Sequence, residues 1–290
     1  MSGRAKGRAL VALVAGGILL GCSPILVRVS ELGPVATAFW RLALGLIPLS
    51  ILFARRRGDG RVPVTMEQHL TAAMPGVFLA GDLATWHTSL HMTSVTNSTL
   101  LANMAPIFVT LVSWLFLHER IRASFVAALA LSITGVVVLN GASFAVGGGG
   151  HVGGDAVAIV AAGFYAGYFI FLARARTAFS TPVVMLWSTI AATVCVLPLA
   201  LLFERAFLPH SLAGWAVVIA LGWLVHAGGQ GLIAFSLAWL PATFSSLTLL
   251  IQPVVAAALA WVVLSEPLRV PQAIGGAIVI AGILLARRSA

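Results

Sequence analysis

The sequence predicts an all-α integral membrane protein in which ten transmembrane helices form two inverted five-helix repeats. Three observations predict this fold: the composition, the spacing of the apolar segments and an internal repeat. Of the 290 residues, 60% are hydrophobic and only 9% are charged, whereas soluble domains carry about 25% charged residues. The composition therefore excludes a soluble domain and makes the lipid bilayer the expected surrounding of the chain.

Ten apolar stretches follow one another along the chain. Most of them are close to the roughly 20 residues that a helix needs to cross a hydrocarbon core of about 30 Å. The connections between them are short, so successive spans are expected to be neighbours in space. The expected helices cover residues 10–29, 34–54, 70–90, 95–117, 122–140, 154–173, 181–203, 212–236, 242–264 and 269–286.

The second half of the chain repeats the first half at a constant offset of 147 residues. When residues 89–139 are placed on residues 236–286 without a gap, 13 of the 51 positions are identical. Each half contains five spans, and an odd number requires the two halves to cross the membrane in opposite directions. The identical pairs include Ser89/Ser236, Thr96/Thr243, Ser98/Ser245, Pro106/Pro253, Trp114/Trp261, Glu119/Glu266, Arg122/Arg269 and Gly135/Gly282.

The repeat also predicts the domain boundaries. We expect the first five-helix repeat over residues 1–140 and the second over residues 155–290. Residues 141–154 between them form a glycine-rich linker, with four consecutive glycines at 147–150, and such a composition is typical of flexible connections. Inverted repeats are typical of secondary transporters that work by alternating access.

The basic residues are concentrated on one side of the expected membrane. A formal net charge of +9 is compatible with nucleic-acid binding, but its distribution indicates topology instead. If the N-terminus is cytoplasmic, 13 of the 17 Lys and Arg residues fall on the cytoplasmic side, as the positive-inside rule requires. We therefore expect a multi-pass protein of the inner cell membrane, with both termini in the cytoplasm and no nucleic-acid partner.

Several short motifs are similar to those of a known family. They are Phe39-Trp40-Arg41-Leu42, Asp82-Leu-Ala-Thr-Trp86, Thr93-Ser-Val-Thr-Asn-Ser-Thr-Leu-Leu101, Ala105-Pro106, Trp114-Leu-Phe-Leu, Glu119-Arg120, Gln252-Pro253, Trp261 and Leu264-Ser-Glu266-Pro267-Leu268. With them the chain resembles the EamA branch of the drug/metabolite transporter superfamily over essentially its whole length. The resemblance implies ten helices around a central cavity and small metabolites, such as amino acids, as substrates. These motifs mostly serve helix packing, so they do not identify the substrate.

Two opposite charges lie at matching depths in neighbouring spans. Arg41 is seven residues, or about 10 Å, inside the second span, and Asp82 is eight residues, or about 12 Å, inside the third. Charges at such depth are costly and need a partner or a function. We expect either that the two side chains pair, or that Arg41 reaches outward while Asp82 faces a water-filled cavity alone. A structural pair and a substrate contact both remain open.

Asp82 is also the only acidic residue deep within a span. This makes it the leading candidate for proton coupling. A dry surrounding would favour its protonated form, whereas a basic partner would favour its charged form. Proton coupling and pairing with Arg41 are therefore competing hypotheses.

Polar and aromatic residues share one helical face in the third, fourth, eighth and ninth spans. Such faces should turn toward the interior of the bundle, where they would suit a small amphipathic metabolite better than an inorganic ion. The alternative is hydrogen bonding between helices without a ligand, which is favoured for an individual Ser or Thr. The candidate substrate contacts are Asp82, Trp86, Ser89, Asn103, Trp223, His226, Gln230, Ser245 and Gln252, together with Tyr168 in the middle of the sixth span.

Two prolines occupy matching positions in the repeat. Pro106 lies within the fourth span and Pro253 within the ninth. Each removes one backbone hydrogen bond and should kink its helix. Matched kinks are candidate hinges for a rocking motion, and static kinks are the alternative.

The leading function is secondary transport of small organic metabolites by alternating access, with amino-acid-like compounds and export favoured. Proton-coupled uptake is one alternative, and a membrane sensor or assembly subunit without transport is another. The sequence contains no glycine-rich phosphate loop with an adjacent Lys and no nucleophile–base set, so neither ATP hydrolysis nor an enzyme is indicated. Neither a cofactor nor a metal is expected. The partners are a small-molecule substrate and the bilayer, and the choice between monomer and dimer is open.

Overall fold

The computed structural model describes residues 3–55, 61–93, 95–116, 118–144, 152–264 and 270–289. This part of the chain is helical and contains no strand. Within it, seven helices are long and apolar enough to cross a membrane, and the shorter stretches Leu100–Leu115 and Ala123–Leu139 are also apolar. The all-α fold is confirmed, and the count of ten spans stays a prediction.

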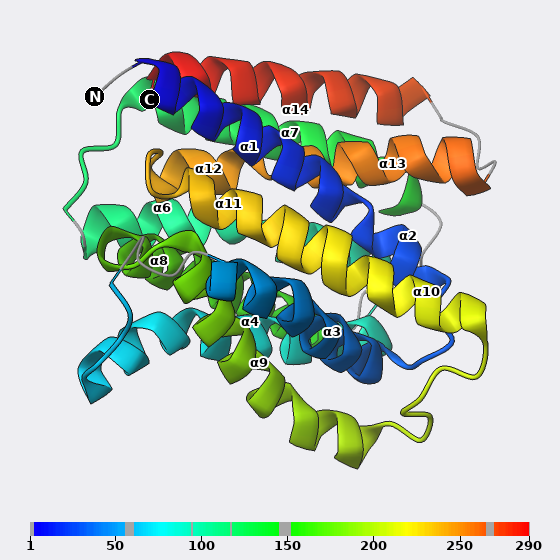
Figure 1. Ribbon diagram of the computed structural model, residues 1–290. Coiled ribbons are helices and arrows are strands. Elements are labelled where there is room, and N and C mark those ends of the chain that lie inside the picture. The colour runs from blue at the N-terminus through cyan, green and yellow to red at the C-terminus, as the bar shows by residue number, and fades with distance from the viewer. Residues whose placement is uncertain are drawn as a thin grey trace.

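The helices of the first half alternate with short connections (Figure 1). They are α1 (Gly3–Gly21), α2 (Ser23–Arg28), α3 (Pro34–Arg55), α4 (Met66–Met92), α5 (Val95–Ala102), α6 (Ala105–Leu115) and α7 (Ala123–Phe144). The second half contains α8 (Val152–Ala178), α9 (Thr181–Phe203), α10 (Leu212–Ala220), η1 (Leu221–Gln230), α11 (Gly231–Ser236), α12 (Ala242–Thr248), α13 (Ile251–Leu264) and α14 (Val270–Ser289).

The expected fourth and ninth spans are not continuous helices. The fourth is divided into α5 and α6, and the ninth into α12 and α13. A proline ring clashes with the carbonyl four residues earlier, and those carbonyls belong to Ala102, the last residue of α5, and to Leu249, the first residue after α12. The expected kinks are therefore complete breaks, and they occur at matching places in the two halves.

The first span is also divided, between α1 and α2 at Cys22. Ser23 and Pro24 begin α2, where the fixed backbone angle of proline suits the first turn of a helix. The eighth span is continuous but changes form, because η1 is a π-helix of 10 residues. A π-helix has about 4.4 residues per turn, so its side chains rotate by roughly 80° per residue instead of 100°.

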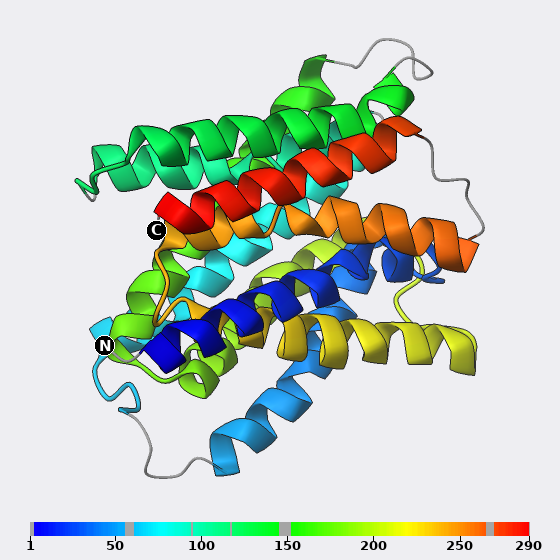
Figure 2. The same ribbon diagram turned by 90° about the horizontal axis from the view of Figure 1, so that it is seen from above.

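The two halves pack with closely matching contacts. Helices α7 and α14 lie side by side along one edge of the bundle (Figures 1 and 2). A β-carbon at Gly135 would press on the backbone of Val279 and Gly275, and one at Gly282 would press on Ser132 and the carbonyl of Ala128. These positions are related in pairs by the offset of 147 residues, so the identical glycines mark one helix pair with local two-fold symmetry.

Other helix contacts are matched in the same way. Helix α4 packs against α8 and α9, and in the other half η1 packs against α1 and α3. In the numbering of the spans, these are contacts of the third span with the sixth and seventh, and of the eighth with the first and second. In each half, one helix therefore packs against two helices of the other half.

Two glutamates connect the halves near the ends of α3 and α10. Glu204, which follows α9, accepts a hydrogen bond from the backbone N–H of Val35 at 2.9 Å. Glu31, which precedes α3, accepts bonds from the backbone N–H of His210, at 2.7 Å, and from the hydroxyl of Ser211, the residue before α10. Each carboxylate thus caps the N-terminus of a helix in the other half, where the helix dipole favours negative charge.

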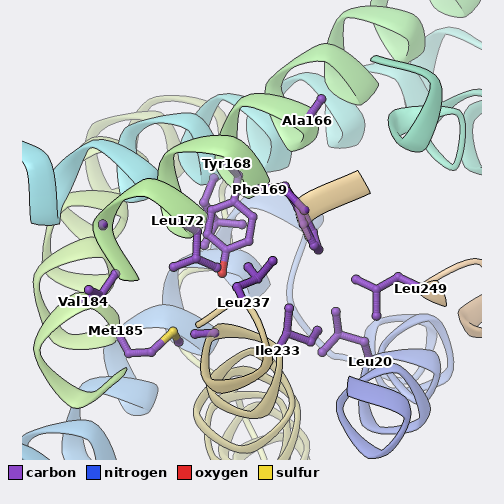
Figure 3. Close-up of a cluster of buried hydrophobic side chains, with 14 of the residues drawn as sticks. Leu20, Ala166, Tyr168, Phe169, Leu172, Val184, Met185, Ile233, Leu237 and Leu249 are labelled. Atoms are coloured by element: carbon purple, nitrogen blue, oxygen red, sulfur yellow. The ribbon is translucent and has the colours of Figure 1, made fainter. Parts of the chain in front are cut away.

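A large hydrophobic core joins α8 and α9 to α11 and α12. Figure 3 shows Tyr168, Phe169 and Leu172 of α8 in one cluster with Ile233 and Leu237. Figure 1 places α11 and α12 toward the end of the bundle at which both termini lie, and α2 and α10 toward the opposite end. The part of this core around α11 and α12 therefore lies toward the side of the termini.

The predicted linker lies only partly within the described residues. Helix α7 continues to Phe144 and α8 begins at Val152, so both helix ends overlap the range 141–154. The glycine run at 147–150, and Glu266 and Arg269 of the repeat, are outside the described residues. The boundaries of the two repeats stay a prediction.

Candidate functional site

A cavity of about 380 Å³ lies among helices from both halves. This volume is in the usual range for small-molecule sites. Its walls combine apolar side chains with amides, aromatic rings and charges. The lining residues are Leu20, Ser23, Pro24, Ile25, Arg28, Arg41, Leu79, Asp82, Leu83, Trp86, Ala102, Asn103, Leu139, Tyr165, Gln230, Gln252, Pro253, Ala256, Ala257 and Gln272.

The cavity is displaced toward the end of the bundle opposite the termini. Arg28, at the end of α2, and Gln272, at the start of α14, both line it, and these helix ends lie away from the N and C labels in Figures 1 and 2. Toward the termini, the space is filled by core side chains. They include Phe169, Leu172 and Leu247, none of which is exposed.

Arg41 lies on α3 and faces this cavity with a mostly buried guanidinium group. The side chain is 9% exposed, and its Nη1 donates a hydrogen bond to the hydroxyl of Ser23 at 3.2 Å. Its Nε is buried and has no hydrogen-bond partner. A buried charge with so few partners is costly, so Arg41 is suited to accept a further anionic or polar group.

Asp82 lies on α4 and faces the same cavity. Among the described residues, no side chain donates a hydrogen bond to its carboxylate, and no ion pair within 4.0 Å joins it to Arg41. The structure therefore places the two charges in one cavity without direct contact. Direct pairing of Arg41 with Asp82 stays a prediction.

Amides and aromatic rings supply the rest of the polar wall. Asn103 lies in the break between α5 and α6, and Gln252 lies in the first turn of α13, next to the second break. Gln230, at the end of η1, accepts a hydrogen bond from the hydroxyl of Tyr168 at 3.2 Å. A continuous helix presents only one of its faces to the cavity. At the helix breaks, amide groups reach the cavity from additional positions.

The structure brings together six of the residues that the sequence singled out, and it places others outside the cavity. The lining set contains Arg41, Asp82, Trp86, Asn103, Gln230 and Gln252, together with Pro253. Tyr168 lies behind the lining: it is 1% exposed, donates a hydrogen bond to Gln230 and stacks on the ring of Tyr165. Pro106 is buried at the start of α6 and is not part of the lining.

Ser89 and Ser245 are buried in helix contacts and do not line the cavity. The hydroxyl of Ser89 donates to the carbonyl of Trp86 at 2.7 Å, and the hydroxyl of Ser236, its repeat equivalent, donates to Ile233 at 2.7 Å. Ser89 is also hydrogen-bonded to Ser98. Ser89 and Ser236 thus make the interhelical or backbone bonds that are the alternative to substrate contact, whereas the buried hydroxyl of Ser245 has no hydrogen-bond partner.

Trp223 and His226 do not line the cavity either. Trp223 is 47% exposed on the outside of the bundle, and His226 is 1% exposed and hydrogen-bonded to Thr189 at 2.9 Å. The spacing of an α-helix places Trp223, His226 and Gln230 on one face. In the π-helix, His226 and Gln230 are rotated by about 115° and 145° from Trp223, which separates the exposed ring from the two buried side chains.

The sequence analysis missed four polar residues of the lining: Ser23, Arg28, Tyr165 and Gln272. Tyr165 precedes Tyr168 by three residues, and the helical period alone does not decide which ring is closer to the cavity. Ser23 and Gln272 lie near helix ends, where the depth in the membrane is a weak signal. For Arg28, the position at the end of an apolar stretch suggested only the membrane surface.

Comparison with known proteins decides the family. The model of the EamA-like transporter family matches the chain twice, over residues 7–141 and 152–288. The chain belongs to the EamA-like transporter family. A model described as solute carrier family 35 also matches this EamA-like protein, over residues 87–197.

Two relatives of this EamA-like protein are described as exporters. A probable terminal-alkyne amino-acid exporter of Streptantibioticus cattleyicolor is 31% identical over 200 residues, which cover 69% of this chain and 66% of the relative. The pseudopaline exporter CntI of Pseudomonas aeruginosa is 26% identical over 288 residues, which cover 97% and 96% of the two chains.

A solved crystal structure has the same fold. It superposes with a TM-score of 0.82 at 21% sequence identity and covers 97% of this chain and 98% of its own. At this identity the likeness concerns the fold alone. Family, relatives and apolar helices together make this EamA-like protein a multi-pass membrane transporter with a small-molecule substrate.

Proposed function

We propose that the protein is a secondary transporter that exports small, amino-acid-like metabolites by alternating access. The observation that carries the proposal is the cavity of about 380 Å³, which extends toward one end of the bundle while a packed core closes the other. A site that is open to one side and closed to the other is what one end state of such a transporter requires. The relatives described as exporters, one of them of an amino acid, support the substrate class and the direction.

In this proposal the ten spans form two inverted repeats, over residues 1–140 and 155–290, joined by the linker 141–154. Both termini lie in the cytoplasm of a cell with the protein in its inner membrane, as the distribution of Arg and Lys favours. The cavity then faces outward. If the two repeats exchanged their conformations, the cavity would open toward the cytoplasm instead.

Flux measurements test the proposal. Purified protein in liposomes loaded with unlabelled leucine or phenylalanine should accumulate the labelled amino acid by exchange, and liposomes without protein should not. Proton-coupled uptake competes because Asp82 faces the cavity without a hydrogen-bond partner among the described side chains. Exchange that is accelerated by a pH gradient, and that loses this acceleration in Asp82→Asn, would favour coupling. Absence of flux for every metabolite tried would favour a sensor or assembly role.

The break before α13 is proposed as a hinge. Replacing Pro253 by Ala restores a backbone N–H and favours a continuous helix, so exchange should slow at least severalfold while ligand binding persists. Pro198→Ala is the matched control, because Pro198 lies inside α9, which continues through it. Equal exchange rates in Pro253→Ala and the wild type would make the break a static feature, and Pro106→Ala tests the matching break.

A further inference from the structure

Two ionisable side chains of opposite type, Arg41 and Asp82, lie buried in the cavity wall with incomplete hydrogen bonding. Arg41 is 9% exposed, and of its polar atoms Nη1 binds Ser23 while Nε has no partner. Asp82 has no hydrogen-bonded side chain around it among the described residues. In the low dielectric of a membrane bundle, the incompletely paired charge of Arg41 has a large free-energy cost, and the carboxyl group of Asp82 ionises favourably only when a cation lies beside it.

The two charges belong to different helices and face the same space. Arg41 is on α3, Asp82 is on α4, and both line the cavity of about 380 Å³. They do not approach within the 4.0 Å of an ion pair, so a ligand fits electrostatically if it carries an anion for one and a cation for the other. A singly charged ligand would supply an opposite charge to only one of the two side chains.

The remaining walls of the cavity restrict the part of the ligand that connects its two charged groups. Leu79 and Leu83 lie on the same helix as Asp82, and Trp86 adds an indole ring one turn further. Tyr165 and the small residues Ala256 and Ala257 line other parts of the cavity. These surfaces suit an apolar or aromatic substituent, while Gln252 and Asn103 can hydrogen-bond either charged group.

We infer that the site selects free zwitterionic α-amino acids with large apolar side chains, by holding the carboxylate at Arg41 and Ser23 and the ammonium group at Asp82. The inference rests on the proposed function and deepens it by assigning each ligand charge to a residue. Arg28 also lines the cavity, but it lies at the exposed end of α2. At the buried Arg41, the carboxylate of a ligand supplies hydrogen-bond partners that the protein itself does not provide.

Binding of three probes of the same shape tests this assignment. Phenylalanine carries both charges, 3-phenylpropionate lacks the ammonium group, and 2-phenylethylamine lacks the carboxylate. Full-length protein in lipid nanodiscs should bind phenylalanine at least about tenfold more tightly than either analogue, because charge-assisted hydrogen bonds are the strong ones. Equal affinity for the three probes would overturn the inference.

Two variants assign the charges to their residues. Arg41→Gln should weaken phenylalanine binding about tenfold and leave 2-phenylethylamine within about twofold of the wild type, and Asp82→Asn should spare 3-phenylpropionate in the same way. Equal losses for all three probes in both variants would mean a structural role and overturn the inference. If Arg41→Gln does not fold, Arg41→Lys keeps the charge without the guanidinium fork and should weaken binding of the two carboxylates only.

The outcome is separable from that of the transport proposal. Exchange of some other labelled metabolite, with no binding of phenylalanine or leucine by the wild type, would overturn the zwitterion site and leave transport standing. Binding with the predicted charge pattern, but without exchange in liposomes, would support the site and contradict transport.

Discussion

Trp86 and Trp223 are the same side chain in two different surroundings. Trp86 lines the cavity, and Trp223 is 47% exposed on the outside. Removing an aromatic wall from a ligand site costs contact area that the outer ring does not supply. We therefore expect Trp86→Ala to weaken phenylalanine binding about tenfold or more and Trp223→Ala to leave it unchanged, as measured by titration in nanodiscs. Equal effects would show that the ligand binds elsewhere.

Glycines provide a second contrast between single residues. A β-carbon at Gly76 of α4 would overlap the backbone carbonyl of Ser188 on α9, whereas one at Gly163 of α8 would meet no atom within 4 Å. Overpacking a close helix contact typically costs about 1–3 kcal/mol, and replacing an uncrowded helical Gly by Ala gains about 0.5–1 kcal/mol.

Thermal unfolding in detergent should therefore show a lower midpoint for Gly76→Ala and an unchanged or higher midpoint for Gly163→Ala. A midpoint for Gly76→Ala equal to that of the wild type would mean that α4 and α9 separate without cost.

At the scale of helices, the glutamates that cap a helix in the other half make the stability of the folded state depend on pH. Hydrogen bonds from Ser211 and the backbone of His210 lower the pKa of the Glu31 carboxyl from its ordinary value of 4.5. A carboxyl with a lowered pKa stabilises the folded state at pH values above the unfolded pKa, and this contribution disappears as the pH falls through the folded pKa.

The difference in unfolding midpoint between the wild type and Glu31→Gln should thus be largest above pH 4.5 and shrink below it. Glu67→Gln, at an exposed carboxyl in the first turn of α4, controls for the loss of one surface charge. A difference that persists unchanged at acid pH would contradict the role of the ionised cap.

The same scale shows where reasoning from the sequence succeeds and where it stops. An α-helical period correctly places Asp82 and Trp86 on one face, because α4 is a regular helix there. The period misleads at Trp223, because η1 is a π-helix, in which residues spaced as on one α-helical face point in different directions. Proline positions predict where α5 and α12 end, but not that amides at the breaks reach the cavity.

For the whole molecule, the repeat predicts the alternative conformation. Arg28 and Leu139 line the cavity, and the offset of 147 residues relates them to Ala175 and Ala286, both of which are 0% exposed. If the repeats exchange their arrangements, these alanines line a cavity open to the side of the termini. Ala192 and its equivalent Gly45 are both buried, so Ala192 should stay inaccessible in both states.

Thiol labelling checks this expectation. In a background without Cys22 and Cys195, Ala175→Cys and Ala286→Cys should react with a membrane-impermeant maleimide added on the side of the termini, whereas Ala192→Cys should not. Reaction of all three at the same low rate would contradict alternating access through these surfaces.

The two charges of the cavity occur in one half of the chain only. The repeat equivalents of Arg41 and Asp82 are Ser188 and Gly229, while Gly135 and Ser89 keep their identities as Gly282 and Ser236. Both halves of the chain have the same small residues at these helix contacts, and only the first half carries the charged groups of the cavity. Mutations at those few charged positions therefore allow the substrate to change without disturbing the helix contacts that both halves share.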